Sequence, residues 1–290
     1  MQIGIFAATF VKPTLQERLD AVRAHGFTHI QFSMGCVGLP ELPDAIDDTL
    51  CYLIRDEVAQ RDMTIAVMSG TFNMCHPDPQ HRHAGVQRLG VLISACRRIG
   101  VPIISLCTGT RDPNSMWRHH PENGSADAWR DMVETVRAAV RIAEDAHITL
   151  AFEPEVSNVV DSAQKARRLL DEIGSESLKV VIDGANIFHK GELPRMREIL
   201  DEAFELLGTD IVSAHAKDLD SDGEAGHLPA GHGLLDYAHY LRLLRHVGFE
   251  GTLLLHGLTE AQVDGCAAFL KSKLAEVTAE NDDTSHTEEK

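Results

Sequence analysis

Four ionisable side chains in the second half of the chain each follow a short apolar run: Glu153, Asp183, His215 and His256. Burying such a group is costly unless the group is paired or bound to a cation. Each residue alone could be an ordinary polar group at the end of a strand, but four in succession favour a metal site. Two carboxylates and two imidazoles suit one divalent ion, and the imidazoles favour manganese, cobalt, iron or zinc over magnesium.

The elements that carry these residues alternate regularly between apolar runs and amphipathic segments with helical spacing. The first amphipathic segment begins with a capping box at Thr14 and Glu17 and stops at Gly26. The alternation predicts an α/β fold, a single closed (β/α)₈ TIM barrel, rather than a doubly wound sheet, because no GxGxxG or Walker loop follows a strand. The predicted strands are Ile3–Ala7, His29–Ser33, Thr64–Met68, Ile103–Cys107, Ile148–Phe152, Lys179–Ile182, Ile211–Ala214 and Thr252–Leu255.

One barrel domain is predicted over residues 1–275, followed by an acidic and disordered tail over residues 276–290. In such barrels the loops at the C-terminal ends of the strands converge. The ionisable residues that follow the apolar runs are therefore expected to meet at that end.

The composition limits the possible partners. The chain has 290 residues and a formal charge of −17, which repels phosphate backbones and excludes a nucleic-acid partner. No run is long enough to span a membrane. Six scattered cysteines without a CxxC pair, and an N-terminus without a basic leader, predict a cytoplasmic protein with reduced thiols.

Several segments resemble the xylose-isomerase-like sugar phosphate isomerase/epimerase family. They are Ala151-Phe152-Glu153-Pro154-Glu155, Val181-Ile182-Asp183, Ala214-His215-Ala216-Lys217-Asp218 and Ala230-Gly231-His232-Gly233-Leu234-Leu235-Asp236. The resemblance implies a metal-dependent isomerase or epimerase that acts on a small carbohydrate. It also implies Glu153, Asp183 and His215 as metal ligands. The family has a glutamate where this chain has His256, so the usual pair of opposed glutamate bases is in doubt.

The mechanism implied by this resemblance proceeds through an enediolate. A metal polarises the carbonyl of an open-chain sugar, and Glu153 takes the neighbouring C–H proton. A second proton-transfer group must then replace the missing glutamate, unless the reaction needs only one. The candidates are Glu155, His76, His189 and Lys217.

The long segment from Thr108 to Pro121 is predicted to form a lid or binding loop. Trp117 in this segment could stack on a sugar or anchor the loop to the rim. An internal ion pair is an alternative role for Lys217 and Asp218, and His76 could instead be a surface histidine. The predicted substrate contacts are Asn73, Thr108, Arg111, Trp117, His120, Asn186, His189 and Lys217.

Three other functions compete with a sugar isomerase or epimerase. A metal-dependent lyase or dehydratase acting on a keto-sugar or keto-inositol needs one base and one acid, which fits His256. A DNA repair nuclease of this fold would need a basic face, which the charge of −17 opposes. A non-catalytic sugar-binding barrel would also tolerate the lost glutamate. A homodimer or homotetramer is expected in each case.

Overall fold

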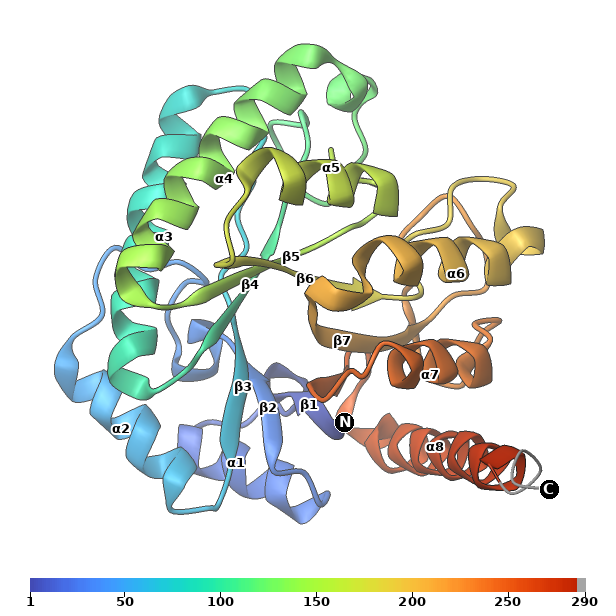
Figure 1. Ribbon diagram of the computed structural model, residues 1–290. Coiled ribbons are helices and arrows are strands. Elements are labelled where there is room, and N and C mark those ends of the chain that lie inside the picture. The colour runs from blue at the N-terminus through green and yellow to red at the C-terminus, as the bar shows by residue number, and fades with distance from the viewer. Residues whose placement is uncertain (286–290) are drawn as a thin grey trace.

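The computed structural model describes residues 1–285, and the side chains through residue 279. Eight parallel strands form a closed barrel, because β6 pairs with both β5 and β7 at the point where the sheet meets itself. Figure 1 shows the helices around the outside of these strands. The barrel prediction is confirmed. The barrel strands are β1 (Gln2–Phe6), β2 (His29–Phe32), β3 (Thr64–Ser69), β4 (Ile103–Cys107), β5 (Thr149–Glu153), β6 (Leu178–Asp183), β7 (Ile211–Asp218) and β9 (Thr252–Leu255).

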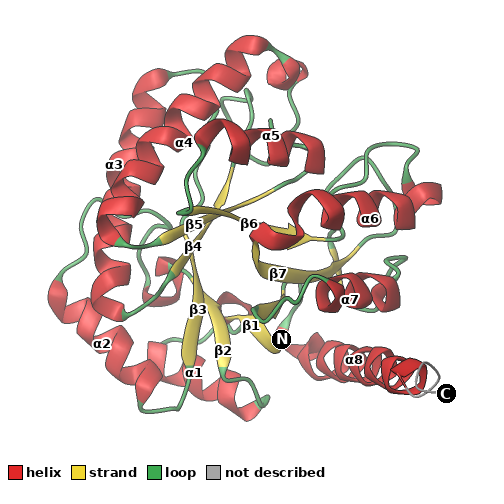
Figure 2. Cartoon of the chain, viewed as in Figure 1, coloured by secondary structure: helices red, strands yellow, loops and turns green. Residues whose placement is uncertain are grey.

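One helix follows each barrel strand, as Figure 2 shows by colour. The predicted capping box is present: the Thr14 side chain accepts a hydrogen bond from the Glu17 amide, and the Glu17 carboxylate accepts one from Thr14. The helices are α1 (Leu15–Ala24), α2 (Asp48–Ala59), α3 (Pro79–Ile99), α4 (Ala126–Ala146), α5 (Ala163–Ile173), α6 (Met196–Leu207), α7 (Tyr237–His246) and α8 (Val263–Ser285). Short 3₁₀ turns lie at Ala7–Thr9, Met34–Val37, Pro121–Gly124, Leu193–Arg195, Gly208–Asp210 and Glu260–Gln262.

The strands are mostly apolar because both of their faces are covered. Ile30, Ile104 and Val180 are fully buried, and so are Leu89 and Leu92 of α3. Parallel strands between a filled barrel and a layer of helices have no solvent-facing side. This is why the strands could be identified as continuous apolar runs. The six cysteines are also buried and free, as the predicted reduced thiols require.

The connection after β7 contains an element that the sequence did not reveal, the two-residue strand β8 (Leu228–Pro229). It pairs antiparallel with the end of β7. Asp218 organises this connection by accepting hydrogen bonds from the amides of Leu219, Gly231 and Leu235 at 2.9–3.0 Å. The ion pair considered as an alternative for Lys217 and Asp218 is therefore not formed, because the Asp218 carboxylate accepts hydrogen bonds from backbone amides instead.

Helix α8 continues past the domain boundary that was expected at residue 275. Val277 is fully buried within the core cluster, which holds this part of the helix against the barrel. Residues 276–285 are thus helical, which differs from the expected disordered tail, and residues 286–290 lie outside the described part of the chain. No helix within residues 1–285 combines the length and the apolar character needed to cross a membrane.

Replacing Val277 tests whether this helical extension belongs to the barrel. Val277→Ala removes two buried methyl groups and should lower the free energy of unfolding by about 2 kcal/mol. Glu276→Ala, at the exposed neighbouring position, should change it by less than about 0.5 kcal/mol. Urea unfolding of both variants is the measurement. Equal values for the two variants would show that α8 is not docked beyond residue 275.

Candidate metal centre

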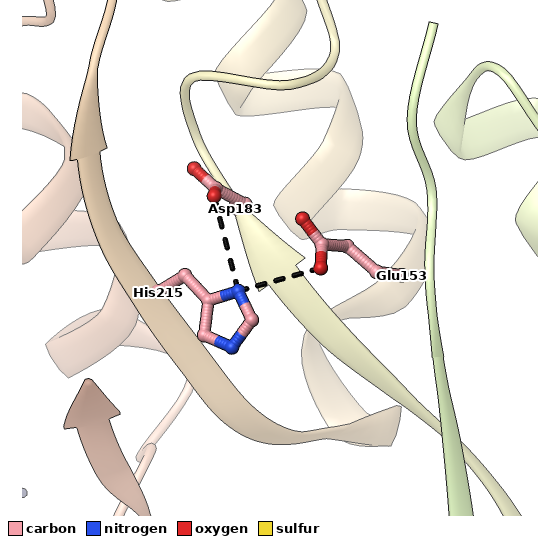
Figure 3. A group of neighbouring side chains, drawn as sticks. All are labelled: Glu153, Asp183 and His215. Atoms are coloured by element: carbon pink, nitrogen blue, oxygen red, sulfur yellow. Dashed lines mark ion pairs between the residues drawn. The ribbon is translucent and has the colours of Figure 1, made fainter. Parts of the chain in front are cut away.

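Three neighbouring strands bring Glu153, Asp183 and His215 together at the C-terminal end of the barrel. Glu153 and Asp183 are the last residues of β5 and β6, and Asp183 is in register with His215 on β7. The His215 Nδ1 atom lies 3.3 Å from Glu153 Oε2 and 3.9 Å from Asp183 Oδ2, as Figure 3 shows. One ligand atom from each residue lies within 4.8 Å of the other two. This spacing suits a shared cation.

Two atoms of this group lack hydrogen-bond partners although they are buried. His215 Nδ1 and Asp183 Oδ2 make no hydrogen bond within the described part of the chain. The opposite ring nitrogen, Nε2 of His215, lies 3.0 Å from Gln31 Oε1, which can only accept. Nε2 is therefore the donor, and this leaves Nδ1 to face the carboxylates. A metal ion at this position would satisfy both unpartnered atoms.

The charge of the cluster also fits a cation. Lys217 Nζ lies 3.1 Å from Asp183 Oδ2; burial opposes its charge, but the Asp183 and Glu153 carboxylates raise the Lys217 pKa. Burial opposes ionisation of Glu153 as well, but His215 and Lys217 lower its pKa to about 2. Asn186 holds Glu153 by donating from Nδ2 to Oε1. The carboxylates of Glu153 and Asp183 thus face a single permanent cation, the ammonium group of Lys217.

His256 lies beside this cluster and is not part of it. Its ring centroid is 5.2 Å from that of His215, but its nitrogens are not among the atoms grouped within 4.8 Å. The register explains the difference: Leu254 pairs with His215, so His256 lies two residues, or roughly 6.6 Å, further along its strand. Nδ1 of His256 is buried without a partner. Burial, with Lys217 and His215 nearby, lowers the His256 pKa to about 3, so the ring is neutral.

Glu155 is a second buried carboxyl group near the cluster. Its two oxygens accept hydrogen bonds from the Ser157 amide at 3.0 Å and from Asn158 Nδ2 at 2.7 Å. Burial raises the Glu155 pKa to about 7, in spite of these hydrogen bonds and with a contribution from the charge of Glu153. The protonation state of Glu155 therefore changes near neutral pH.

A cavity of about 120 Å³ opens beside the cluster. Trp117, from the long loop after β4, lines it and remains 53% exposed, which places the indole at the mouth. The cavity wall contains carboxyl, imidazole, hydroxyl and apolar groups but neither lysine nor arginine. The lining residues are Phe6, Gln31, Glu41, Ser69, Thr71, Ser105, Leu106, Cys107, Trp117, Glu153, Glu155, His215 and His256.

Several predicted substrate contacts lie away from this cavity and organise loops. Asn73 Oδ1 accepts hydrogen bonds from the amides of Thr110 and Cys75, and Thr108 Oγ1 accepts one from the Val160 amide. His120 caps a short 3₁₀ turn. Short polar side chains commonly bind backbone amides in loops in this way, and substrate contact by these residues stays a prediction.

Three further residues that were predicted to contact the substrate or transfer a proton make other contacts. Arg111 is buried in an ion pair of 2.8 Å with Asp131. His76 accepts a hydrogen bond from the Asp78 amide and lies 3.3 Å from a backbone carbonyl oxygen, with its ring stacked on His81. His189 lines a different pocket. None of the three belongs to the cavity wall.

The predicted site residues do not include Gln31, Glu41, Thr71 or two serines, all of which line the cavity. Gln31 donates hydrogen bonds from Nε2 to Ser69 Oγ at 2.9 Å and to Ser105 Oγ at 3.1 Å. Gln31 and Ser105 interrupt apolar strand sequences, and this interruption was the available signal. Glu41 and Thr71 lie in loops after β2 and β3, where the pattern gave no signal.

Fold and site together define a class of protein: a closed parallel barrel with two carboxylates and one imidazole converging from adjacent strands. The sequence matches the xylose isomerase-like TIM barrel family model over residues 19–272, and the chain belongs to this family. The resemblance seen in the sequence is confirmed.

Three similar proteins share between 15% and 24% sequence identity with this chain. A Haemophilus influenzae protein named as an L-ribulose-5-phosphate 3-epimerase, SgbU, is 24% identical over 279 residues, which cover 89% of each chain. The structure of an L-ribulose 3-epimerase has a TM-score of 0.77 at 16% identity and 98% coverage of each chain. The IolI protein, solved with a bound zinc atom, has a TM-score of 0.72 at 15% identity, covering 97% of this chain and 99% of its own.

The hydrogen bond between Gln31 and His215 predicts a metal-affinity effect. Gln31→Met removes the acceptor that fixes His215, and the affinity for manganese or zinc should fall by about 10- to 100-fold. Gln164→Met, at an exposed position on α5, is the matched control. Titration of the metal-free protein with each metal measures the affinity. Unchanged affinity in Gln31→Met would show that Gln31 does not orient the ligand.

The neutral state of His256 predicts a pH dependence of stability. Because burial lowers its pKa from 6.5 to about 3, the unfolded chain binds more protons between these values. Stability is therefore full above pH 6.5 and falls below it, by up to about 1.4 kcal/mol per pH unit from this residue. His256→Gln should flatten the loss of unfolding free energy between pH 7 and pH 5, whereas His227→Gln, at an exposed site, should not. Identical pH profiles would contradict this assignment.

Proposed function

We propose that this chain is a metal-dependent isomerase or epimerase that acts on a small unphosphorylated keto-sugar. The observation that carries the proposal is the cluster of Glu153, Asp183 and His215 beside a cavity, in which His215 Nδ1 is buried without a hydrogen-bond partner and Asp183 Oδ2 has only the ion pair with Lys217. The names of the relatives support a carbohydrate substrate and 3-epimerase chemistry. The zinc atom bound in IolI supports a divalent ion, for which we propose manganese, cobalt, iron or zinc.

Glu153, Asp183 and His215 would hold the ion. A divalent cation held there would supply Lewis-acid polarisation of the carbonyl of an open-chain sugar, which would make the adjacent C–H proton easier to remove. Glu153 takes this proton because it is ionised and lines the cavity. Asn186 fixes the orientation of the Glu153 carboxylate, and Lys217 forms an ion pair with Asp183.

The cavity wall favours a neutral polyol over a sugar phosphate. Its charged or ionisable members are Glu41, Glu153, Glu155 and two histidines, and it presents no lysine or arginine. A phosphate dianion needs cations or clustered donors, and apart from the proposed metal ion the described residues of this wall offer it no side chain with a permanent positive charge. Ser69, Ser105 and Gln31 instead offer hydrogen bonds that suit sugar hydroxyl groups, and Trp117 offers a flat apolar face.

A lyase or dehydratase is the second candidate, and His256 is the observation that favours it. A neutral imidazole stands where the family resemblance implies a glutamate as the fourth ligand, so one of the two opposed bases is absent from its usual strand. A dehydration needs a single base and an acid for the departing hydroxyl group. Loss of water from the substrate, instead of inversion at carbon, would identify this activity.

Metal content and proton exchange test the proposal together. Protein purified without chelators should carry about one divalent ion per chain, and Asp183→Asn should lose it, while Asp44→Asn, at an exposed site, should keep it. In D₂O, the metal-loaded protein should exchange the C3 proton of L-ribulose or D-tagatose, and should act more slowly on L-ribulose 5-phosphate. A chain that binds neither added metal nor these sugars would instead be a non-catalytic barrel.

A further inference from the structure

Glu41 is an ionisable residue of the cavity wall that comes from outside the metal cluster. It follows β2 in the chain, whereas the cluster comes from β5, β6 and β7. In the closed strand order, three strands separate β2 from β6 in either direction. Glu41 therefore reaches the cavity beside Thr71, which follows β3, and not from the strands of the cluster, and a sugar held in the cavity would contact both Glu41 and Glu153.

The surroundings of Glu41 favour its protonated form. The side chain is half-buried, and its contact is a long hydrogen bond of 3.4 Å from Thr71 Oγ1 to Oε1. No lysine or arginine in the described part of the chain lies within ion-pair distance of it. Burial raises the Glu41 pKa above its ordinary value, against a smaller lowering by Thr71. A carboxyl group of this kind, facing a cavity, is suited to proton transfer.

Other cavity residues are less suited to deliver a proton to the far face of a substrate. Both oxygens of Glu155 are held by Ser157 and Asn158, and Glu155 comes from the same strand end as Glu153. The His256 ring is neutral. Glu41 thus provides, from an element outside the cluster, a carboxyl group in the same cavity as Glu153.

We propose that Glu41 is the second proton-transfer residue of the epimerisation, acting on the face of the substrate opposite Glu153; this rests on the proposed function. Glu153 takes the proton from the carbon beside the carbonyl, and the electron pair of that C–H bond forms the C=C bond of the enediolate. Glu41, as a carboxylic acid, then gives its proton to the opposite face of the same carbon, and the carbonyl forms again. Exchange with water returns a proton to Glu41 and removes one from Glu153.

The two steps can be separated in D₂O with L-ribulose and D-tagatose as probes. Glu41→Gln should lower epimer formation by about 10²- to 10⁴-fold. It should still incorporate deuterium at the reacting carbon with retention of configuration, because Glu153 returns a deuteron to its own face. Glu153→Gln should lose both exchange and epimer formation. Glu250→Gln, at an exposed site, should match the wild type in both.

Two further measurements exclude a structural explanation: Glu41→Gln should keep the metal content and the unfolding midpoint of the wild type. Epimer formation by Glu41→Gln at the control rate would overturn the proposal. Loss of exchange together with epimer formation would also overturn it, since Glu41 would then act in binding. If the wild type with its metal exchanges neither sugar, the proposed function fails, and the role of Glu41 fails with it.

Discussion

The concentration of buried negative charge at the ends of β5 and β6 is the constraint on which the site depends. Two carboxylates and a ring nitrogen of His215 converge within 4.8 Å in a low-dielectric region. Lys217 is the permanent cation beside them. Buried like charges are unstable unless positive charge accompanies them, so such an arrangement is expected where a cation is held. The rest of the barrel end fixes these groups in place.

The support for the cluster comes from elements far apart in sequence. Gln31 on β2 reaches across the barrel to His215, and its amide is fixed in turn by Ser69 and Ser105. On the outer side, the buried Tyr240 hydroxyl group donates to the carbonyl oxygens of Ile182 and His215 at 3.1 Å. This ties α7 to the two strands that carry ligands. The relative positions of Asp183 and His215 therefore depend on contacts with several other strands and with α7, that is, on the closed barrel as a whole.

The sequence allowed prediction of the barrel and of the cluster but not of the cavity wall. Apolar runs identified the eight barrel strands because both faces of each strand are buried, and the first ionisable residue after each of three runs proved to face its neighbours. Loop residues gave no such periodic signal. Asn73 and Arg111 were predicted to contact the substrate; in the structure, Asn73 binds loop amides and Arg111 forms an ion pair with Asp131. Glu41 reaches the cavity from a loop, and no periodic sequence pattern predicts where a loop residue lies.

The change from glutamate to His256 alters the electrostatics of the site as well as its chemistry. A carboxylate on β9 would add a third negative charge near Glu153 and Asp183, whereas the neutral ring adds none. With less repulsion, the cluster needs less positive charge to be stable. Under the proposed mechanism, a carboxyl group from a loop outside the cluster can then serve as the second proton-transfer group. Its pKa can be set by its own surroundings rather than by the ion, as the partial burial of Glu41 allows.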